Sequence, residues 1–240
     1  MSHRHASNDS SVTSLIRVGS LLAVALGLFG IVLGAALIYG SLQSQLALEQ
    51  ASRAAEDRAR NITVALSAIQ AAMRDPQVQE FAQDAIAQSG GTSERLERAL
   101  RGRGVINIVD LRAFPPVIEE IELGDYPEPD FSVIEMLLEA RRGDQATIQV
   151  HFPGSANENL AFAEAIRIQN QLVGVLFLRI PVSAITSILT DAGPLDHVAL
   201  VQGRGEQATA FKALGSGARS NLQSIRIDGS HLSLQWARAT

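Results

Sequence analysis

The longest apolar stretch of the chain lies near its N-terminus, where Val18 to Leu48 contains no charged residue. Its most hydrophobic part, Leu21 to Tyr39, would form a helix about 28 Å long at a rise of about 1.5 Å per residue. That length matches the hydrocarbon core of a bilayer, which is about 30 Å thick. A secretory signal has a shorter apolar region and a small-residue cleavage site, and no good site follows this run. The pattern favours a retained membrane anchor over a cleaved export signal or a buried soluble helix.

Charges beside the apolar run predict its orientation. Arg4 and Arg17 precede it with one acidic residue, Asp9, whereas no charge follows it until Glu49. Positively charged flanks stay in the cytoplasm, so the N-terminal tail is expected inside and the bulk of the chain in a bacterial periplasm. The expected location is therefore the bacterial inner membrane, which the chain crosses once.

Gly30 and Gly34 form a small-xxx-small pair within this run. Such a pair lets two membrane helices approach closely, so this face is the candidate helix–helix contact of a homodimer. Glycine is also frequent in membrane helices, so simple tolerance is the alternative explanation.

Helical periodicity continues after the apolar run. Residues 41–74 lack proline and glycine, which predicts one long helix. Apolar residues recur on one face of it at spacings of three and four: Ala55, Ala59, Ile62, Leu66, Ile69 and Met73. We expect this stripe to pack on the chain's own domain rather than in a coiled coil, because its first half is alanine and polar residues. Asp75-Pro76 should end the helix and start a second, and Ser93 should cap a third.

From Val105 onward the period becomes that of strands. Short apolar runs predict strands at 105–111, 146–152, 159–168, 172–180, 197–202, 208–214, 224–227 and 231–237. Helices are expected at 131–143 and 181–193, with an irregular, proline-rich connection at 113–130. Strands that adjoin in sequence favour antiparallel pairing. The predicted fold class is α+β: a transmembrane helix and a long juxtamembrane helix lead into a mainly antiparallel sheet with helices on one face.

These elements divide the chain into four expected parts. They are a cytoplasmic tail at 1–17, a transmembrane helix at 18–40, a helical juxtamembrane segment at 41–104 and an α+β extracytoplasmic domain at 105–240. Hydrophobic residues make up 46% of the chain and charged residues 19%, which is enough apolar material for a core.

Composition narrows the chemistry. A net charge of −5 and a single lysine argue against a nucleic-acid partner. The absence of cysteine excludes disulfides, thiolate metal sites and cysteine nucleophiles. The sequence also lacks G-x-S-x-G, H-E-x-x-H and Walker motifs. We therefore predict a protein that is not an enzyme by itself, with no catalytic residue, metal site or cofactor.

Arginine presents a planar fork of donors to carboxylates and phosphates. Arg112, Arg167 and Arg179 are therefore the candidate anion or ligand contacts, together with His151. Alternation along the strands could instead point the arginines at solvent, and a strand histidine often makes a single structural hydrogen bond.

The plan of a membrane helix, a long helix and an α+β domain resembles the Cache-like, PAS-related sensor ectodomains of bacteria. A closer resemblance runs through "VINIVDL", "FSVIEMLLEA", "IQVHFPGSANENLAFAEAI", "QLVGVLFLRIPVSAI" and "LSLQWA". These stretches look like the extracytoplasmic N-terminal extension of long-form proteobacterial phosphomannomutase/phosphoglucomutase of the alginate-pathway type. The catalytic part of that family carries a T-A-S-H-N-P loop and a D-G-D-x-D-R loop, and this sequence has neither. The resemblance therefore implies no mutase activity here.

The leading expectation is a single-pass inner-membrane protein with a periplasmic sensory or partner-docking domain. Its partners would be the lipid bilayer, a second copy of the chain, and a small ligand or an envelope protein. One alternative is a structural or assembly anchor for an envelope polysaccharide complex, and another is the detached N-terminal part of a phosphomannomutase/phosphoglucomutase. A pocket with convergent polar groups would favour sensing, whereas a solid core with an exposed apolar patch would favour docking.

Overall fold

The computed structural model describes residues 9–87, 91–116, 131–143, 148–203, 208–215 and 222–238. Most of the predicted connection at 113–130 and the start of the N-terminal tail lie outside these ranges. The chain forms two compact units, Met1–Gln50 and Ala51–Thr240.

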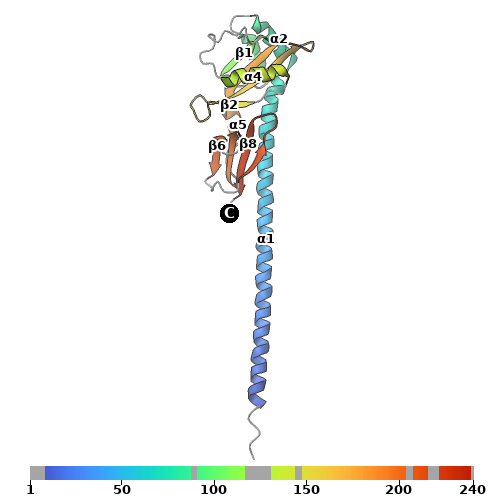
Figure 1. The fold of residues 1–240 in the computed structure, drawn as a ribbon, viewed down its shortest axis with the longest axis vertical. Coiled ribbons are helices and arrows are strands. Elements are labelled where there is room, and N and C mark those ends of the chain that lie inside the picture. The colour runs from blue at the N-terminus through green and yellow to red at the C-terminus, as the bar shows by residue number, and fades with distance from the viewer. Residues whose placement is uncertain are drawn as a thin grey trace, which may run out of the picture. The chain divides into compact units, whose positions relative to one another are not determined.

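Helix α1, Asp9–Met73, is continuous through the boundary between these units (Figure 1). In the first unit its large apolar side chains from Leu26 to Tyr39 are between 52% and 69% exposed. A helix that is apolar on all sides belongs in an apolar medium. By length and composition, α1 contains a segment able to cross a membrane.

In the second unit, α1 buries one face. Ala55, Ala59, Ile62, Leu66 and Met73 are at most 5% exposed and share one hydrophobic cluster with residues of both sheets. The expected packing of this stripe on the chain's own domain is thus confirmed.

Two short helices follow the end of α1. The side chain of Asp75 caps α2, Pro76–Ile86, by accepting a hydrogen bond from the backbone N–H of Gln77. Helix α3, Glu94–Gly102, begins after Ser93, which takes the N-cap position without a side-chain capping bond. Both helix starts therefore lie where the sequence placed them.

A first antiparallel sheet has the order β1-β4-β3-β2. Its strands are β1 Asp110–Phe114, β2 Gln149–His151, β3 Asn159–Ile168 and β4 Gln171–Pro181. Gln169 and Asn170 close the β3–β4 hairpin with φ values of 50° and 66°. Such left-handed pairs match the twist of a two-residue hairpin.

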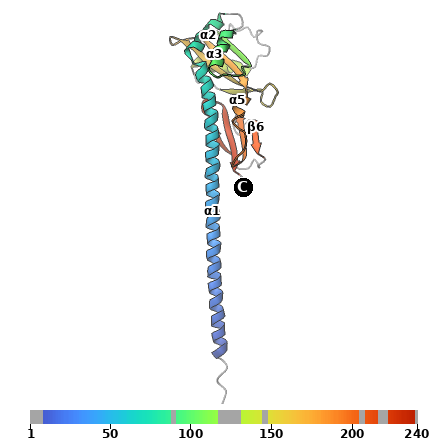
Figure 2. The ribbon, with the colours of Figure 1, turned by 180° about the vertical axis from the view of Figure 1, so that it is seen from behind.

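Both faces of this sheet are covered. Leu176 and Leu178 of β4 face the cluster that contains the α1 stripe, whereas Val175 and Phe177 face α4, Phe131–Arg142. Helix α4 lies across the sheet in Figure 1. Figure 2 shows the molecule from the other side, where α2 and α3 are labelled. The alternation expected for a central strand is confirmed.

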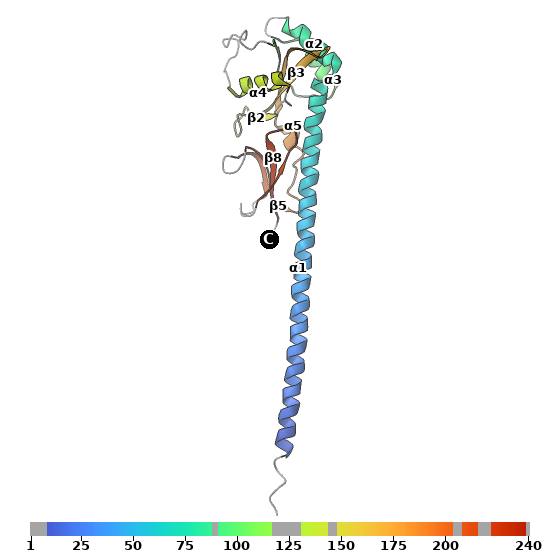
Figure 3. The same cartoon turned by 45° about the vertical axis from the view of Figure 1, so that its right-hand side comes forward.

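A second antiparallel sheet has the order β6-β5-β8-β7. Its strands are β5 Leu195–Gln202, β6 Thr209–Gly215, β7 Gln223–Arg226 and β8 Leu232–Arg238. The short helix α5, Ser183–Thr186, precedes it (Figure 3). The α+β fold class is confirmed; its strands form two sheets, and helices cover both faces of the first sheet instead of one.

Two predicted elements differ from the structure. The strand expected at 105–111 begins only at Asp110, because Gly104 and Asn107 have φ values of 88° and 55°, which break an extended run. The helix expected at 181–193 shrinks to α5. Beyond α5, the N–H groups of Ile188 and Leu189 donate to carbonyls three residues earlier, so the chain continues in single turns instead of an α-helix.

We expect Phe177→Ala to lower the free energy of unfolding by about 3–5 kcal/mol, because the ring is fully buried and its removal leaves a cavity. Denaturant titration of the full chain in detergent measures the loss. Phe152→Ala is the control: that ring is 38% exposed, and its removal should cost less than about 1 kcal/mol. A loss below about 1 kcal/mol for Phe177→Ala would show that β4 is not central.

A pH dependence follows from the start of α2. The hydrogen bond from Arg103 is the main cause that holds the pKa of Asp75 below its ordinary value of 3.8, and the Gln77 backbone N–H adds to it. A carboxylate whose pKa is lower in the folded state stabilises the fold above its unfolded pKa, and this contribution disappears as the pH falls through the folded pKa.

Asp75→Asn should therefore reduce the melting temperature at pH 7, and its difference from the wild type should shrink as the pH falls below 3.8. Thermal unfolding between pH 2 and pH 7 measures both effects. Asp84→Asn, at an exposed position of α2, should leave the profile unchanged. A pH-independent difference for Asp75→Asn would contradict the ion pair as its cause.

Candidate functional site

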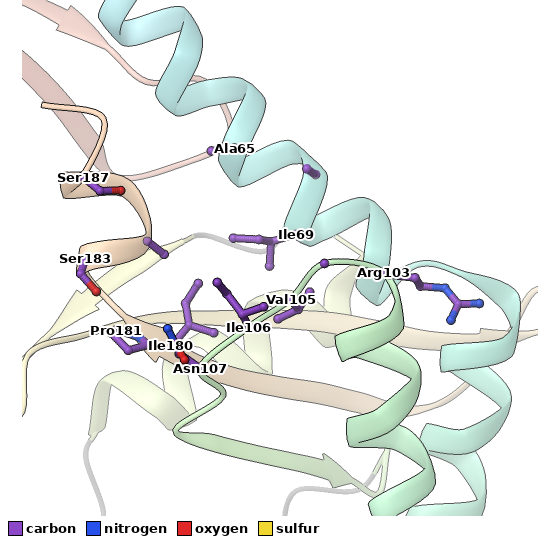
Figure 4. A pocket seen from close by; sticks show the side chains of 13 residues that line it. Ala65, Ile69, Arg103, Val105, Ile106, Asn107, Ile180, Pro181, Ser183 and Ser187 are labelled. Carbon is purple, nitrogen blue, oxygen red and sulfur yellow. The ribbon is translucent and has the colours of Figure 1, made fainter.

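One cavity, of about 360 Å³, lies between α1, the segment after α3 and α5. Ile69, Ile106 and Ile180 line it, and Ser183 and Ser187 contribute hydroxyl groups (Figure 4).

The charged residue at the edge of this cavity is already engaged. Arg103 donates hydrogen bonds to Asp75 and to Gln77, and its side chain extends away from the centre of the cavity in Figure 4. The walls of this cavity are therefore mainly apolar.

A larger cavity, of about 680 Å³, lies at one end of the first sheet. Asp110 pairs with Arg179 across β1 and β4, and Asn159 of β3 pairs with Pro181. Residues directly opposite each other in an antiparallel pair project to the same face, so the register itself gathers these side chains. The cavity is lined by Val109, Asp110, Arg112, Phe152, Ser155, Ala156, Asn157, Glu158, Asn159, Arg179 and Pro181.

The charges in the larger cavity are unequally compensated. The Nε of Arg112 lies 3.2 Å from Oδ1 of Asp110. Glu158 accepts a hydrogen bond from the backbone N–H of Gly154 at 2.9 Å. The guanidinium of Arg179 lies over the Phe177 ring, 5.2 Å from its centroid, and no ion pair to it occurs among the described residues.

Two polar atoms of this site are buried without a hydrogen-bond partner among the described residues: Nε of Arg179 and Oδ1 of Asn159. Asn159 is only 6% exposed, and its amide nitrogen donates to the carbonyl of Asn157. A buried polar group without a partner is costly and usually has a ligand, an ion or water to satisfy it. Arg179 and Asn159 thus contribute one donor and one acceptor that no described residue satisfies.

His151 lies next to this cavity but does not line it. It is 2% exposed, and its Nε2 lies 3.3 Å from Oγ of Ser132. The following residue, Phe152, lines the cavity in its place and stands edge-on to the His151 ring. Phe152 has a φ of 55°, a strained conformation for an aromatic residue and one that is enriched at functional sites.

The four residues predicted as ligand contacts therefore do not lie in one site. Arg112 and Arg179 meet in the larger cavity, and His151 supports its wall. Arg167 is exposed near Gly143 at the opposite end of β3, about 26 Å along the strand from Asn159.

Asp110, Phe152 and Asn159 were not singled out from the sequence. Phe152 directly precedes Pro153-Gly154, and that turn signal could have drawn attention to it. The described residues contain no group of three side chains suited to hold a metal ion.

In the first unit, a Cβ added at Gly30 or Gly34 would meet no atom within 4 Å, so both glycines present open helix surface. The proposed helix–helix contact is therefore sterically accessible.

No family model matches this chain, and no curated protein matches it. Among solved structures it is similar to the ligand-binding domain of the Pseudomonas aeruginosa PAO1 amino acid chemoreceptor PctC in complex with GABA. That comparison has a TM-score of 0.42 and 15% identity and covers 77% of this chain and 96% of that one.

It is also similar to the sensory domain of the Campylobacter jejuni chemoreceptor Tlp3 with isoleucine bound, with a TM-score of 0.37, 14% identity, and coverage of 77% of this chain and 92% of that one. The Tlp3 domain in complex with L-valine gives a TM-score of 0.36 and 12% identity over 77% of this chain and 92% of that one. Scores of this size leave the family and the ligand unassigned.

Proposed function

We propose that this chain is a membrane-anchored sensory protein whose Ala51–Thr240 unit binds a small carboxylate-bearing ligand in the larger cavity. The observation that carries the proposal is the pair of buried atoms without partners, Nε of Arg179 and Oδ1 of Asn159. The cavity, at about 680 Å³, has the size of typical small-molecule sites.

The charges select the ligand chemistry. Asp110 pairs with Arg112, whereas neither Arg179 nor Glu158 has a charged partner among the described residues of the site. An anion that accepts from Arg179 would gain a charge-assisted hydrogen bond, and a planar carboxylate fits the guanidinium fork. The Asn159 carbonyl oxygen would accept from a hydroxyl or ammonium group of the same molecule.

The membrane part of the proposal rests on α1. Exposed apolar side chains from Leu26 to Tyr39 support a span at 18–40, and the basic flank supports a cytoplasmic tail at 1–17. The segment 41–104 and the domain 105–240 would then lie in the periplasm, on the inner membrane. Helix α1 has no break between the span and the buried stripe, so two arrangements of this helix could report ligand occupancy.

Gly30 and Gly34 would form the contact with a second copy. The resemblance to the mutase extension adds no residue to the site, and we propose no catalytic step for this chain.

The test compares two arginines on the same sheet. Isothermal titration of the full chain in nanodiscs uses succinate, lactate and glutamate, with the dication putrescine as the opposite-charge control. We expect at least one carboxylate to bind and putrescine not to bind. Arg179→Met should weaken carboxylate binding by at least about 10-fold, because a hydrogen bond to a charged group contributes about 1.5–3 kcal/mol.

Arg167→Met is the matched control, since it removes the same group from the opposite end of β3 and should leave the affinity unchanged. Absence of carboxylate binding by the wild type would contradict the proposal. Equal losses of carboxylate affinity in the two variants would show that the net charge of the protein, and not this cavity, governs binding.

A further inference from the structure

Strand β2 leads directly into Phe152 of the larger cavity and has an unusual second edge. On one side, its residues Gln149–His151 pair with β3. On the other side, the side chain of Gln202, the last residue of β5, binds Val150 twice. Oε1 of Gln202 accepts from the Val150 N–H, and Nε2 donates to the Val150 carbonyl at 3.0 Å.

This pair of bonds copies what a neighbouring strand would make. A primary amide carries one acceptor and two donors in one plane, so it can satisfy both the N–H and the C=O of a single residue. Gln202 thus acts as a strand substitute from the second sheet. A strand of three residues paired on one side only would be weakly held.

The turn before β8 adds a backbone bridge to the same edge. Ile148 forms a parallel bridge with Ser230, and the His231 N–H donates to the Ile148 carbonyl at 3.3 Å. Ser230 is 2% exposed, and its hydroxyl donates to the Ile227 carbonyl and accepts from the Leu232 N–H. The turn is therefore fixed, and β2 is attached to the second sheet at two points.

The attached strand leads directly to the cavity. Val150 is followed by His151, which pairs with Asn159, and then by Phe152. Asn159 and Phe152 both line the cavity. In the second sheet, Gln202 pairs with Leu232 at the start of β8. The Gln202 side chain, beside the Ile148–Ser230 bridge, thus joins β2 to the sheet that carries Trp236.

We propose that Gln202 is a positioning residue that holds the Phe152–Asn159 wall of the cavity and couples its occupancy to the second sheet. The coupling rests on the ligand-binding function proposed above, whereas the attachment of β2 does not. A residue that only protected a strand edge would hold β2 without passing any change to β8.

The first measurement needs no ligand. Amide hydrogen exchange of the full chain in nanodiscs compares the wild type with Gln202→Met, which keeps the length of the side chain and removes both hydrogen bonds. We expect the Val150 amide to exchange at least about 10-fold faster in the variant and the Leu178 amide of central β4 to be unchanged. Gln223→Met, at an exposed position of β7, is the matched control and should behave as the wild type.

The second measurement reads the coupling. Trp236 is the only tryptophan of the chain and is 1% exposed on β8, so its emission reports on the second sheet. We expect a saturating carboxylate probe, succinate or glutamate, to shift this emission in the wild type. In Gln202→Met the probe should bind several-fold more weakly, and the shift at saturation should be smaller, since only the Ile148–Ser230 bridge still joins β2 to the second sheet.

The outcomes separate the two claims. Unchanged exchange at Val150 in Gln202→Met would overturn the attachment itself. Faster exchange with an unaltered Trp236 response and affinity would leave Gln202 as a structural bond and overturn the positioning role. Failure of the wild type to bind any carboxylate would contradict the proposed function and the coupling together, while the exchange result would still decide the attachment.

Discussion

The buried stripe of α1 is the contact on which the rest of the structure depends. Its residues from Ala51 to Met73 belong to the hydrophobic cluster that also contains the inner faces of both sheets. Polar contacts hold this helix at two positions along its length. Arg58 bonds to Asp191, just before the second sheet. Arg74, directly after the last residue of α1, pairs with Glu164 of β3 in the first sheet at 2.9 Å. Without this helix, each sheet would expose one apolar face.

The same constraint explains the position of the larger cavity. The α1 cluster covers one face of the first sheet, and α4 covers much of the other with Val133, Met136, Leu137 and Ala140. The apolar residues of β4 end at the α4 face with Phe177, and the next residue on that face is Arg179. The sheet thus changes from core to polar site within two residues, and the register brings Asp110 and Asn159 to the same end. A donor and an acceptor remain there without partners in the part of the chain that the structure describes.

Sequence periodicity predicted most elements because the causes are local. The spacing of the α1 stripe, the break at Asp75-Pro76 and the alternation in β3 and β4 are all visible in neighbouring residues. The division into two sheets was not, since it depends on pairings between segments distant in sequence, such as β1 with β4 and β5 with β8. The length of the α5 helix was overestimated, because the chain after Thr186 makes three-residue turns instead of helical bonds.

Only part of the candidate site could be predicted from the sequence. Arginine chemistry identified Arg112 and Arg179, but the same reasoning also selected Arg167, and only strand register separates them. Phe152 and Asn159 carry no motif, and their role depends on how β2, β3 and β4 meet. The proposal of a sensory protein therefore depends on geometry for its ligand site and on hydropathy for its membrane anchor.

Cysteine labelling tests most directly that one helix serves both as a membrane anchor and as the core of an exported domain. The chain has no cysteine, so single substitutions give an unambiguous signal. Ser67 is exposed on α1, whereas its neighbour Leu66 is 1% exposed in the stripe. In intact cells with a permeabilised outer membrane, a membrane-impermeant thiol reagent should label Ser67→Cys rapidly and Leu66→Cys only after unfolding. Labelling of Ser67→Cys only after lysis of the inner membrane, or equal labelling of both positions in the folded protein, would contradict the account.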